Sequence, residues 1–284
     1  MKWLIYGHKG WIGSYFCNYV KQKFSDVELV YPTSRADNIQ NVSEDLDQIN
    51  PDRVISFIGR TSGPGFNTID YLEQKGKLIE NIRDNLFSPI ILMEQCELRN
   101  IHCTYLGTGC IFSYKFPDDP PFTETSEPNF KGSRYSFIKG ITDQLTKEFS
   151  NVLNVRIRMP IVEYDCTKNF ISKIIRYPLI CNTLNSMTVL PDAIPALVKC
   201  ILDSRVGTIN LVNPEPIDHN IILELYKKYV NHNHTWKNMT EEEQDKMLLG
   251  QRSKNVLVPS FDLPKTKDSV ERIFLSGKFN KPDN

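Results

Sequence analysis

A tyrosine and a lysine with the types and spacing for proton transfer occur together at Tyr135 and Lys139. Residues four apart lie on the same face of a helix, so the ammonium is placed to lower the pKa of the phenol through space. A phenol in that setting can donate a proton to a carbonyl oxygen. The same spacing is common on solvated helix faces, so the pair gains meaning only beside further groups of matching chemistry.

The hydroxyl of Thr108 is such a group. It follows the apolar run 101–106, at the end of an expected buried strand, and ligands of parallel sheets bind at that end. A lone threonine after a glycine also caps turns. Beside Tyr135 and Lys139, Thr108 indicates a site that binds and polarises a carbonyl group.

A glycine-rich turn near the N-terminus predicts a nucleotide site. The apolar run 3–6 leads into glycines spaced GxxGxxG and then into an amphipathic segment. Gly7 permits the tight turn, Gly10 lets a pyrophosphate approach the backbone, and Gly13 lets helix and strand pack closely. We expect a dinucleotide to contact Gly7, Gly10, Trp11, Ile12 and Gly13; a purely structural turn is the alternative.

The tip of the second expected strand favours NADPH as the cofactor. Residues 27–31 form that strand, and Ser34 and Arg35 follow it without an acidic residue at the tip. An acidic residue there would bind the ribose 2′-hydroxyl of NADH, whereas an arginine suits a 2′-phosphate. We expect Ser34 and Arg35 to contact the cofactor. NADH is the alternative cofactor, and an ordinary loop cation is the alternative role of Arg35.

Composition excludes several classes of partner. The 284 residues carry 34 lysines and arginines and 34 aspartates and glutamates, so no net charge draws the chain to nucleic acid or to a membrane surface. Seven scattered cysteines form no CxxC pair, and the histidines at 219, 232 and 234 lack further ligands at metal spacing, so we expect no metal. No signal peptide or membrane-length apolar run is recognised. These features predict a cytoplasmic protein, in the host cytoplasm if the chain is viral.

Apolar runs alternate with helical segments, which predicts an α/β fold with a Rossmann-like, doubly wound parallel sheet. The expected strands lie at 3–6, 27–31, 53–57, 101–106 and 153–157. We expect residues 1–160 to form an NADP-binding Rossmann domain, to which a strand near 207–213 returns. Residues 161–284 are expected to form mostly a smaller C-terminal substrate-binding lobe.

Helical patterns fill the intervals between these strands. The longest runs from about 68 to 98, with a kink or break expected at Pro89. The proline-rich stretch 114–131 is expected to be an irregular loop at the carboxyl edge of the sheet. Later helices are expected near 169–176, 192–203, 219–230 and 241–249.

These residues together resemble the extended short-chain dehydrogenase/reductases over nearly the whole chain. Narrower strings are similar to the UDP-4-keto-6-deoxyglucose 3,5-epimerase/4-reductase family, which makes UDP-L-rhamnose in plants and in a giant virus. The matching strings lie at 6–7, 10–13, 108–112, 128–130, 156–160, 169–174, 185–188 and 252–253. The chain departs from the plant pattern in a shorter loop after Phe112 and in His8 and Lys9.

The resemblance implies epimerisation of a keto sugar followed by its reduction. A ketone at C4 acidifies the hydrogens at C3 and C5, and the resemblance makes Cys110 and Lys173 the acid/base pair that inverts those carbons. It also implies that Thr108 polarises the ketone, Tyr135 protonates the C4 oxygen, and Lys139 holds the cofactor ribose. From the bare sequence, Cys110 reads as a small buried apolar residue and Lys173 as an exposed helix residue.

Further substrate contacts and partners follow from the same resemblance. We expect Asn85, Asn169 and Asn185 to contact the UDP-sugar or its pocket, and Arg252 to bind the diphosphate, because its planar fork matches phosphate oxygens. An upstream UDP-glucose 4,6-dehydratase is expected to supply the keto sugar. The helices near 78–97 and 135–149 are where relatives often pair, so a homodimer is expected.

Two other functions remain open from the sequence. A monofunctional 4-keto reductase of the dTDP-rhamnose or GDP-fucose type would share the fold and the Tyr135/Lys139 pair, but Cys110 with Lys173 argues against it. A catalytically silent regulatory subunit that binds nucleotide would share the fold alone. The presence of Thr108, Tyr135 and Lys139 together counts against that second function.

Overall fold

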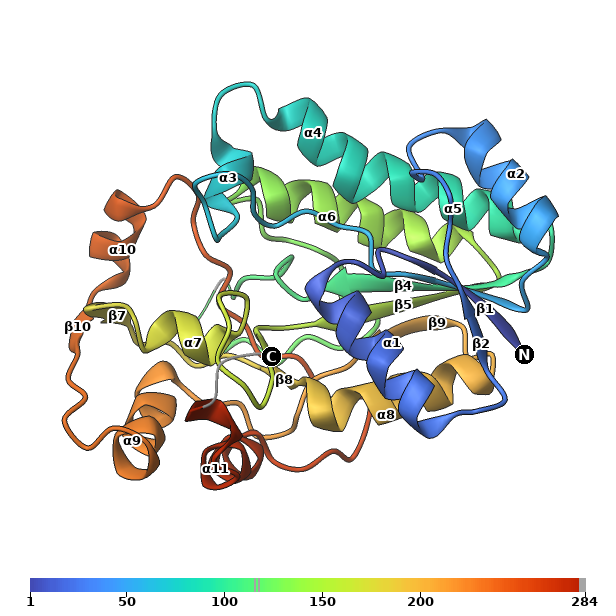
Figure 1. Ribbon diagram of the computed structural model, residues 1–284. Helices are drawn as coiled ribbons and strands as arrows, with labels where there is room; N and C mark the ends of the chain where they lie inside the picture. The colour runs from blue at the N-terminus through green and yellow to red at the C-terminus, as the bar shows by residue number, and fades with distance from the viewer. Residues whose placement is uncertain (115, 117, 281–284) are drawn as a thin grey trace.

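A six-stranded parallel sheet forms the centre of the molecule (Figure 1). The computed structural model describes residues 1–114, 116 and 118–280. In spatial order the strands are β2 (Glu28–Val30), β1 (Lys2–Tyr6), β3 (Arg53–Ser56), β4 (His102–Thr108), β5 (Val152–Ile157) and β9 (Gly207–Asn210). This is a doubly wound order, whose direction switches between β1 and β3, so the predicted fold class is confirmed.

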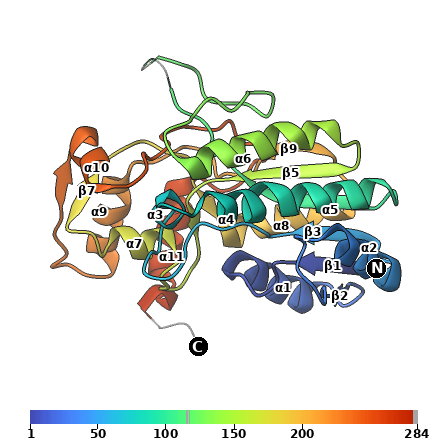
Figure 2. The same ribbon diagram turned by 90° about the horizontal axis from the view of Figure 1, so that it is seen from above.

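The strands are apolar because both faces of the sheet are covered. On one face α1 (Trp11–Lys23) and α8 (Leu190–Leu202) pack on the sheet, and their buried side chains join one apolar cluster with those of β1 and β5. On the other face α2 (Ile39–Ile49) and α5 (Ser88–Glu97) pack against β3 and β4. Helix α6 (Arg134–Leu145) lies beside α5 in that layer (Figure 2).

The long helical stretch predicted for 68–98 is divided, but not at Pro89. It begins as α3 (Asp70–Glu73) and restarts as α4 (Leu78–Ile82), which continues through a π-helical segment, Arg83–Phe87, into α5. Pro89 has no N–H to donate to the carbonyl of Asn85, and the Thr142 hydroxyl donates to that carbonyl instead at 2.7 Å. The extra residue of the π turn and this bond from α6 let the helix pass Pro89 without a break.

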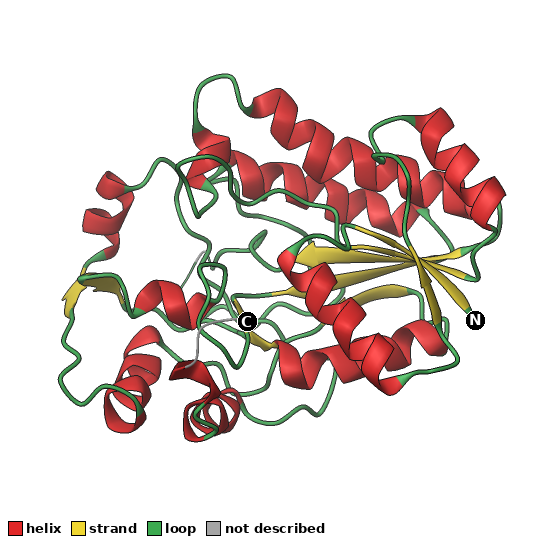
Figure 3. Ribbon diagram, viewed as in Figure 1, coloured by secondary structure: helices red, strands yellow, loops and turns green. Residues whose placement is uncertain are grey.

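A smaller lobe lies at the carboxyl end of the sheet (Figure 3). Its core joins α7 (Phe170–Ile174), α9 (His219–Tyr229) and α11 (Thr266–Leu275). The sequence analysis predicted the first two of these helices and missed α11. Shorter elements complete the two parts: β6 (Pro160–Ile161), β7 (Leu179–Cys181), β8 (Thr188–Val189), β10 (Lys237–Met239), α10 (Glu241–Met247) and the 3₁₀ turns Thr146–Glu148 and Lys278–Asn280.

Two sequence-based boundaries need comment. A division at residue 160 assigns α8 to the lobe, whereas its buried residues belong to the apolar cluster of the sheet, because α8 leads directly into β9. The stretch 114–131 is irregular as expected where it is described, but Lys115 and Pro117 lie outside the described residues, as do the last four residues of the predicted lobe.

Within the described part of the chain, no helix combines the length and apolarity that crossing a membrane requires.

Candidate active site

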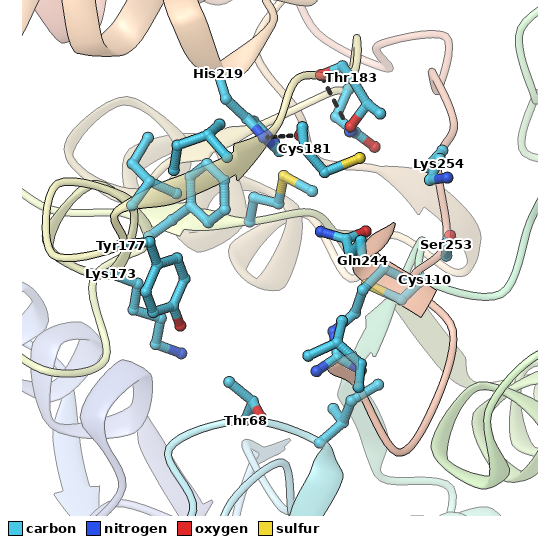
Figure 4. Close-up of a pocket in the computed structure, with 18 of the residues that line it drawn as sticks. Thr68, Cys110, Lys173, Tyr177, Cys181, Thr183, His219, Gln244, Ser253 and Lys254 are labelled. Atoms are coloured by element: carbon cyan, nitrogen blue, oxygen red, sulfur yellow. Dashed lines mark hydrogen bonds between the residues drawn. The ribbon is translucent and has the colours of Figure 1, made fainter. Parts of the chain in front are cut away.

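A cavity of about 540 Å³ lies between the carboxyl edge of the sheet and the lobe. Segments that follow β3, β4 and β5 form one wall, and α7, β7 and α9 contribute the other. It brings together five of the predicted site residues: Cys110, Tyr135, Lys173, Asn185 and Arg252. In Figure 4, Cys110 and Lys173 lie on opposite sides of the open space.

Thr108 and Tyr135 meet at the end of β4. The Cys110 backbone N–H donates to the Thr108 Oγ1 at 3.1 Å, and the side chains of Thr108 and Tyr135 are hydrogen-bonded. Burial raises the pKa of Tyr135 above its ordinary value, and Cys110 adds to this, while the bond to Thr108 opposes it. Tyr135 is therefore a neutral phenol that carries the proton an acid must deliver.

The start of α6 fixes the position of Tyr135. Ser133 caps the helix, since its Oγ accepts a hydrogen bond from the Ser136 N–H at 3.1 Å. Glu73 accepts from the backbone N–H groups of Arg134 at 2.9 Å and of Tyr135 at 3.2 Å. The carboxylate also suits the positive end of the helix dipole.

Lys139 is buried one turn further along α6 and does not act on Tyr135 as expected. Its Nζ donates to the Tyr105 hydroxyl and lies 4.4 Å from the centre of that ring. Burial lowers the pKa of Lys139 to about 7, against the opposing effects of Asp143 and Cys110. The prediction that Lys139 lowers the pKa of Tyr135 is therefore wrong for this structure. Burial raises the pKa of the phenol, and the Lys139 amine donates to Tyr105.

The lowered pKa of Lys139 predicts a stability that rises with pH. Between pH about 7 and the ordinary lysine value of 10.5, the folded chain binds fewer protons at this site than the unfolded chain. Stability then increases as pH rises through that window. We expect the melting temperature of the ligand-free protein to rise more steeply from pH 7 to 9 than that of Lys139→Met. The exposed-site control Lys147→Met should keep the wild-type slope, and an equal slope in all three proteins would contradict the prediction.

Lys173 reaches the cavity from the lobe. Its Nζ donates to the Asn67 carbonyl at 3.1 Å, and burial lowers the pKa of the side chain to about 8, with Lys168 acting in the same direction. An amine that titrates there can hold or release a proton near neutral pH.

Asn169 supports Lys173 and does not line the cavity. Its Oδ1 caps α7 by accepting from the Ile171 N–H at 3.3 Å, and its Nδ2 donates to the carbonyls of Val162 and Tyr164 at 3.0 and 2.8 Å. Because the side chain is fully buried and both of its ends are occupied, the structure gives Asn169 a positioning role.

Of the other predicted substrate contacts, Asn185 and Arg252 line the cavity and Asn85 does not. Asn185 is buried at the cavity wall, where its Nδ2 donates to the Thr183 Oγ1 at 2.9 Å. Arg252 lines the cavity and pairs with Asp70. Asn85 lies outside it, and holds the segment after β3 by bonding the N–H and the carbonyl of Arg60 at 2.9 and 3.0 Å.

Arg158 is a site residue that the sequence analysis missed. It is fully buried at the cavity wall, and its Nη1 donates to the Cys110 Sγ at 2.9 Å. The available signal was a second arginine in Arg156-Ile157-Arg158, at the carboxyl end of β5 where ligands bind.

The glycine turn after β1 has the geometry of a phosphate cradle. Gly7 has φ +77°, and a Cβ on Gly13 would approach the Gly7 carbonyl oxygen to 2.3 Å. A Cβ on Gly10 would have only that oxygen nearby, at 3.1 Å, so this side of the turn is open. Helix α1 has no side-chain cap and no acidic residue in its first turn, which contains Trp11 and Ile12. Its first N–H groups are thus free of a competing side-chain acceptor and fit a pyrophosphate.

Ser34 and Arg35 lie beyond the tip of β2. The Ser34 Oγ donates to Asp45 at 3.0 Å, and the Arg35 guanidinium pairs with Asp37 and Asp84 at 3.0 and 3.1 Å. The Arg35 side chain is 63% exposed, and such surface pairs are weak. A phosphate could therefore draw this guanidinium away from its present partners at little cost.

The described residues contain no group of three or more potential metal ligands.

Comparisons with known proteins agree with this arrangement. A family model described as NAD dependent epimerase/dehydratase matches residues 3–176. The chain is 45% identical to the solved UDP-rhamnose synthase of Acanthamoeba polyphaga mimivirus, with a TM-score of 0.93 and coverage of 96% of this chain and 98% of that one. It is 34% identical over 260 residues to an Arabidopsis thaliana bifunctional dTDP-4-dehydrorhamnose 3,5-epimerase/dTDP-4-dehydrorhamnose reductase, covering 89% of this chain and 84% of that one.

The name of a longer relative also includes a 3,5-epimerase and a reductase, in its case for UDP-linked sugars. The Arabidopsis thaliana trifunctional UDP-glucose 4,6-dehydratase/UDP-4-keto-6-deoxy-D-glucose 3,5-epimerase/UDP-4-keto-L-rhamnose-reductase is 35% identical over 260 residues. The alignment covers 90% of this chain and 38% of that protein.

Proposed function

The chain belongs to the NAD dependent epimerase/dehydratase family, and from that premise we propose that it converts UDP-4-keto-6-deoxy-D-glucose into UDP-L-rhamnose. The protein is a bifunctional 3,5-epimerase and NADPH-dependent 4-keto reductase. One observation carries the proposal: a thiol and an amine, Cys110 and Lys173, line the same cavity as the phenol Tyr135. A plain reductase needs only the phenol as its acid, whereas inversion of C3 and C5 needs a separate base and acid, which the thiol and the amine supply.

The epimerisation uses Cys110 and Lys173 as base and acid. The base removes the proton from C3 or C5, the electron pair of that C–H bond forms a double bond to C4, and the π pair of the C4 carbonyl moves to its oxygen to give an enolate. The acid returns a proton to the same carbon from the opposite face, and the carbonyl re-forms. The step is redox-neutral, and the opposite positions of the two side chains in Figure 4 support it.

The reduction takes place in the same cavity. A nicotinamide cofactor, when bound, would supply the hydride to C4. Tyr135 delivers its proton to the C4 oxygen, and Thr108 lies beside it to polarise the carbonyl. In this proposal Lys139, whose Nζ donates to the Tyr105 hydroxyl, would hold the cofactor ribose.

The cofactor in this proposal is NADPH, with NADH as the alternative. The open side of Gly10 and the uncapped start of α1 support a bound pyrophosphate, and Arg35 supports the 2′-phosphate. Asn185 and Arg252 contact the substrate on the cavity wall in this proposal, with Arg252 bound to the diphosphate.

Two alanine substitutions in the glycine turn separate cofactor binding from folding. Gly10→Ala places a methyl group where only the Gly7 carbonyl is near, so we expect little loss of stability and a rise of about tenfold or more in the NADPH dissociation constant. Gly13→Ala forces a backbone clash, so we expect a loss of about 1–3 kcal/mol in the free energy of unfolding. Denaturant unfolding and fluorescence titration with NADPH measure the two effects. Equal behaviour of the variants would contradict the predicted geometry.

The function is tested by turnover in deuterated water. The purified protein is incubated with UDP-4-keto-6-deoxyglucose and NADPH, cofactor oxidation is followed by absorbance, and the product is analysed by NMR. Deuterium at both C3 and C5 of an L-rhamnose product supports the proposal. Oxidation of NADPH without label would instead identify a plain reductase, and NADPH binding without turnover on UDP or dTDP keto sugars would favour a regulatory subunit. Repeating the assay with NADH tests cofactor preference.

The substrate must come from a reaction that oxidises C4 of a UDP-hexose and removes water. We infer that a UDP-glucose 4,6-dehydratase supplies it, an activity that the name of the trifunctional Arabidopsis relative also includes. We also retain a cytoplasmic location in the proposal, supported by seven free cysteines, which suit a reducing compartment.

A homodimer is the final part of the proposal. The continuous helix that runs from α4 through α5 lies beside α6 (Figure 2), and large apolar side chains along both are exposed, with Ile79 74% exposed. The others are Leu78, Phe137 and Leu145, together with Leu98 directly after α5. We expect the wild-type protein to sediment as a dimer and Ile79→Asp to sediment as a monomer at the same concentration. A wild-type monomer would contradict this part.

A further inference from the structure

Arg158 is a buried cation without a carboxylate partner. The side chain is fully buried, and among the described residues no aspartate or glutamate lies within ion-pair distance of it. Its Nη2 donates to the Ser253 carbonyl at 3.2 Å and to the Asn185 Oδ1, while its Nε has no hydrogen-bond partner among the described residues. The charge of the guanidinium is therefore met by neutral acceptors alone.

Arg156, two residues earlier and inside β5, is by contrast a buried arginine with a carboxylate partner. It is equally buried, yet its Nη2 and Nε bind both oxygens of Asp143 at 2.6 and 2.8 Å. Burying a charge without a counter-charge is costly, so Arg158 must either lower the stability of the fold or be offset by an ionisable neighbour.

Cys110 is the ionisable neighbour that the guanidinium touches. The Arg158 Nη1 donates to the Cys110 Sγ at 2.9 Å, whereas its second contact from the same nitrogen, to the Ser253 Oγ, is 3.4 Å long. A thiolate accepts such a bond more strongly than a thiol, because the bond then joins opposite charges. The other ionisable groups described as interacting with Cys110 are Tyr135 and Lys139, both on α6.

We propose that Arg158 is a positioning residue for the epimerisation, and that it holds Cys110 as a thiolate aimed into the cavity. The inference rests on the proposed function for its catalytic meaning, because the thiolate is then the base that removes the protons at C3 and C5. The charge pairing itself is a property of the ligand-free protein. It also gives the guanidinium the negative partner that the rest of its surroundings lack.

A purely structural arginine would behave differently. The contacts of Nη2 tie the end of β5 to Asn185 and Ser253, and losing them would loosen the cavity wall without changing the ionisation of Cys110. The deciding readout is therefore the pH dependence of thiol reactivity, since thiolate and not thiol reacts with alkylating agents.

The experiment measures the rate at which iodoacetamide alkylates Cys110 in the full-length, ligand-free protein. The rate is measured at about ten pH values between pH 5.5 and 10. Peptide mass spectrometry distinguishes Cys110 from the other six cysteines. The variants are Arg158→Met, which removes the charge, and Arg158→Lys, which keeps it. Arg156→Lys is the matched control, since it shortens a neighbouring buried arginine, in β5, that does not contact Cys110. Circular dichroism confirms folding of each.

We expect the rate profile of Arg158→Met to move to higher pH by about one unit, so that alkylation at pH 7 becomes about tenfold slower. Arg158→Lys should recover part of this difference, and Arg156→Lys should follow the wild type. A folded Arg158→Met with the wild-type profile would overturn the inference.

A comparison within the wild type decides the matter if Arg158→Met does not fold. We expect Cys110 of the native chain to reach half of its maximum rate at a lower pH than the same cysteine in the denatured chain. The opposite order would overturn the inference. The assay uses no substrate, so it separates the failure of this inference from a failure of the proposed function, which would show as absent turnover with the alkylation result intact.

Discussion

Cys110→Ser is expected to reduce the incorporation of solvent deuterium at C3 and C5 by about 10²–10⁴-fold, the range found for loss of a general acid or base. Serine keeps the size of the side chain and the space beside Arg158, but its hydroxyl does not ionise near neutral pH. The hydride-transfer half is affected far less, because Tyr135 and Thr108 remain in place. Supplying UDP-4-keto-L-rhamnose, which is already epimerised, measures that half directly through NADPH oxidation.

Cys200→Ser is the matched control for this variant. Cys200 is buried in α8, in the apolar cluster that packs on the sheet, and it is not among the residues that line the cavity. Its substitution should leave both the labelling and the reduction near their wild-type rates. If Cys110→Ser still incorporates deuterium rapidly at C3 and C5, Cys110 is not part of the acid/base pair, and the proposed mechanism has no base.

Tyr135→Phe is expected to lower the rate of NADPH oxidation by about 10²–10⁴-fold while deuterium still enters C3 and C5. The variant removes the phenol proton and keeps the ring that fills the space beside Thr108. Burial raises the pKa of Tyr135, so the wild-type group stays protonated across the neutral range. Single-turnover absorbance at 340 nm and NMR of the recovered keto sugar measure the two halves separately.

Tyr229→Phe supplies the comparison, because Tyr229 ends α9 in the lobe and bonds to Glu271 away from the cavity. We expect it to retain both activities. The two active-site variants should therefore separate the two reactions: Cys110→Ser loses the labelling, and Tyr135→Phe loses the reduction. Loss of both in Tyr135→Phe, in a protein that still binds NADPH, would mean that the phenol also takes part in epimerisation. A catalytically silent regulatory subunit would show neither effect.

Local patterns in the sequence predicted the sheet and the identity of its main chemical groups. Runs such as 3–6 and 153–157 are apolar because both faces of a parallel strand are covered, so each run predicts a strand from its own residues. The turn at Gly7 is equally local, since φ +77° and the close approach to Phe57 demand glycine. The pair of Tyr135 and Lys139 follows from helical spacing, and the resemblance to known strings supplied Cys110 and Lys173.

Other features of the fold depend on packing between segments that are distant in the sequence, so local patterns did not predict them. The passage of the long helix across Pro89 depends on Thr142, from another helix, and the position of α8 depends on which face its apolar side covers. The sequence analysis places Asn169 among the ligand contacts, whereas in the folded chain its Oδ1 caps α7 and its Nδ2 is held by two backbone carbonyls.

The ionisation of the site was likewise set by tertiary structure. Spacing alone predicted that Lys139 acts on Tyr135, whereas burial lowers the pKa of the amine and raises that of the phenol. Arg158 and Cys110 lie 48 residues apart in sequence and meet only because β4 and β5 are neighbours in the sheet. The sequence by itself determined which groups are present and which elements carry them. The ionisation and the contacts of these groups depend on all the segments that surround them and exclude water from the cavity. Only the folded chain brings those segments together.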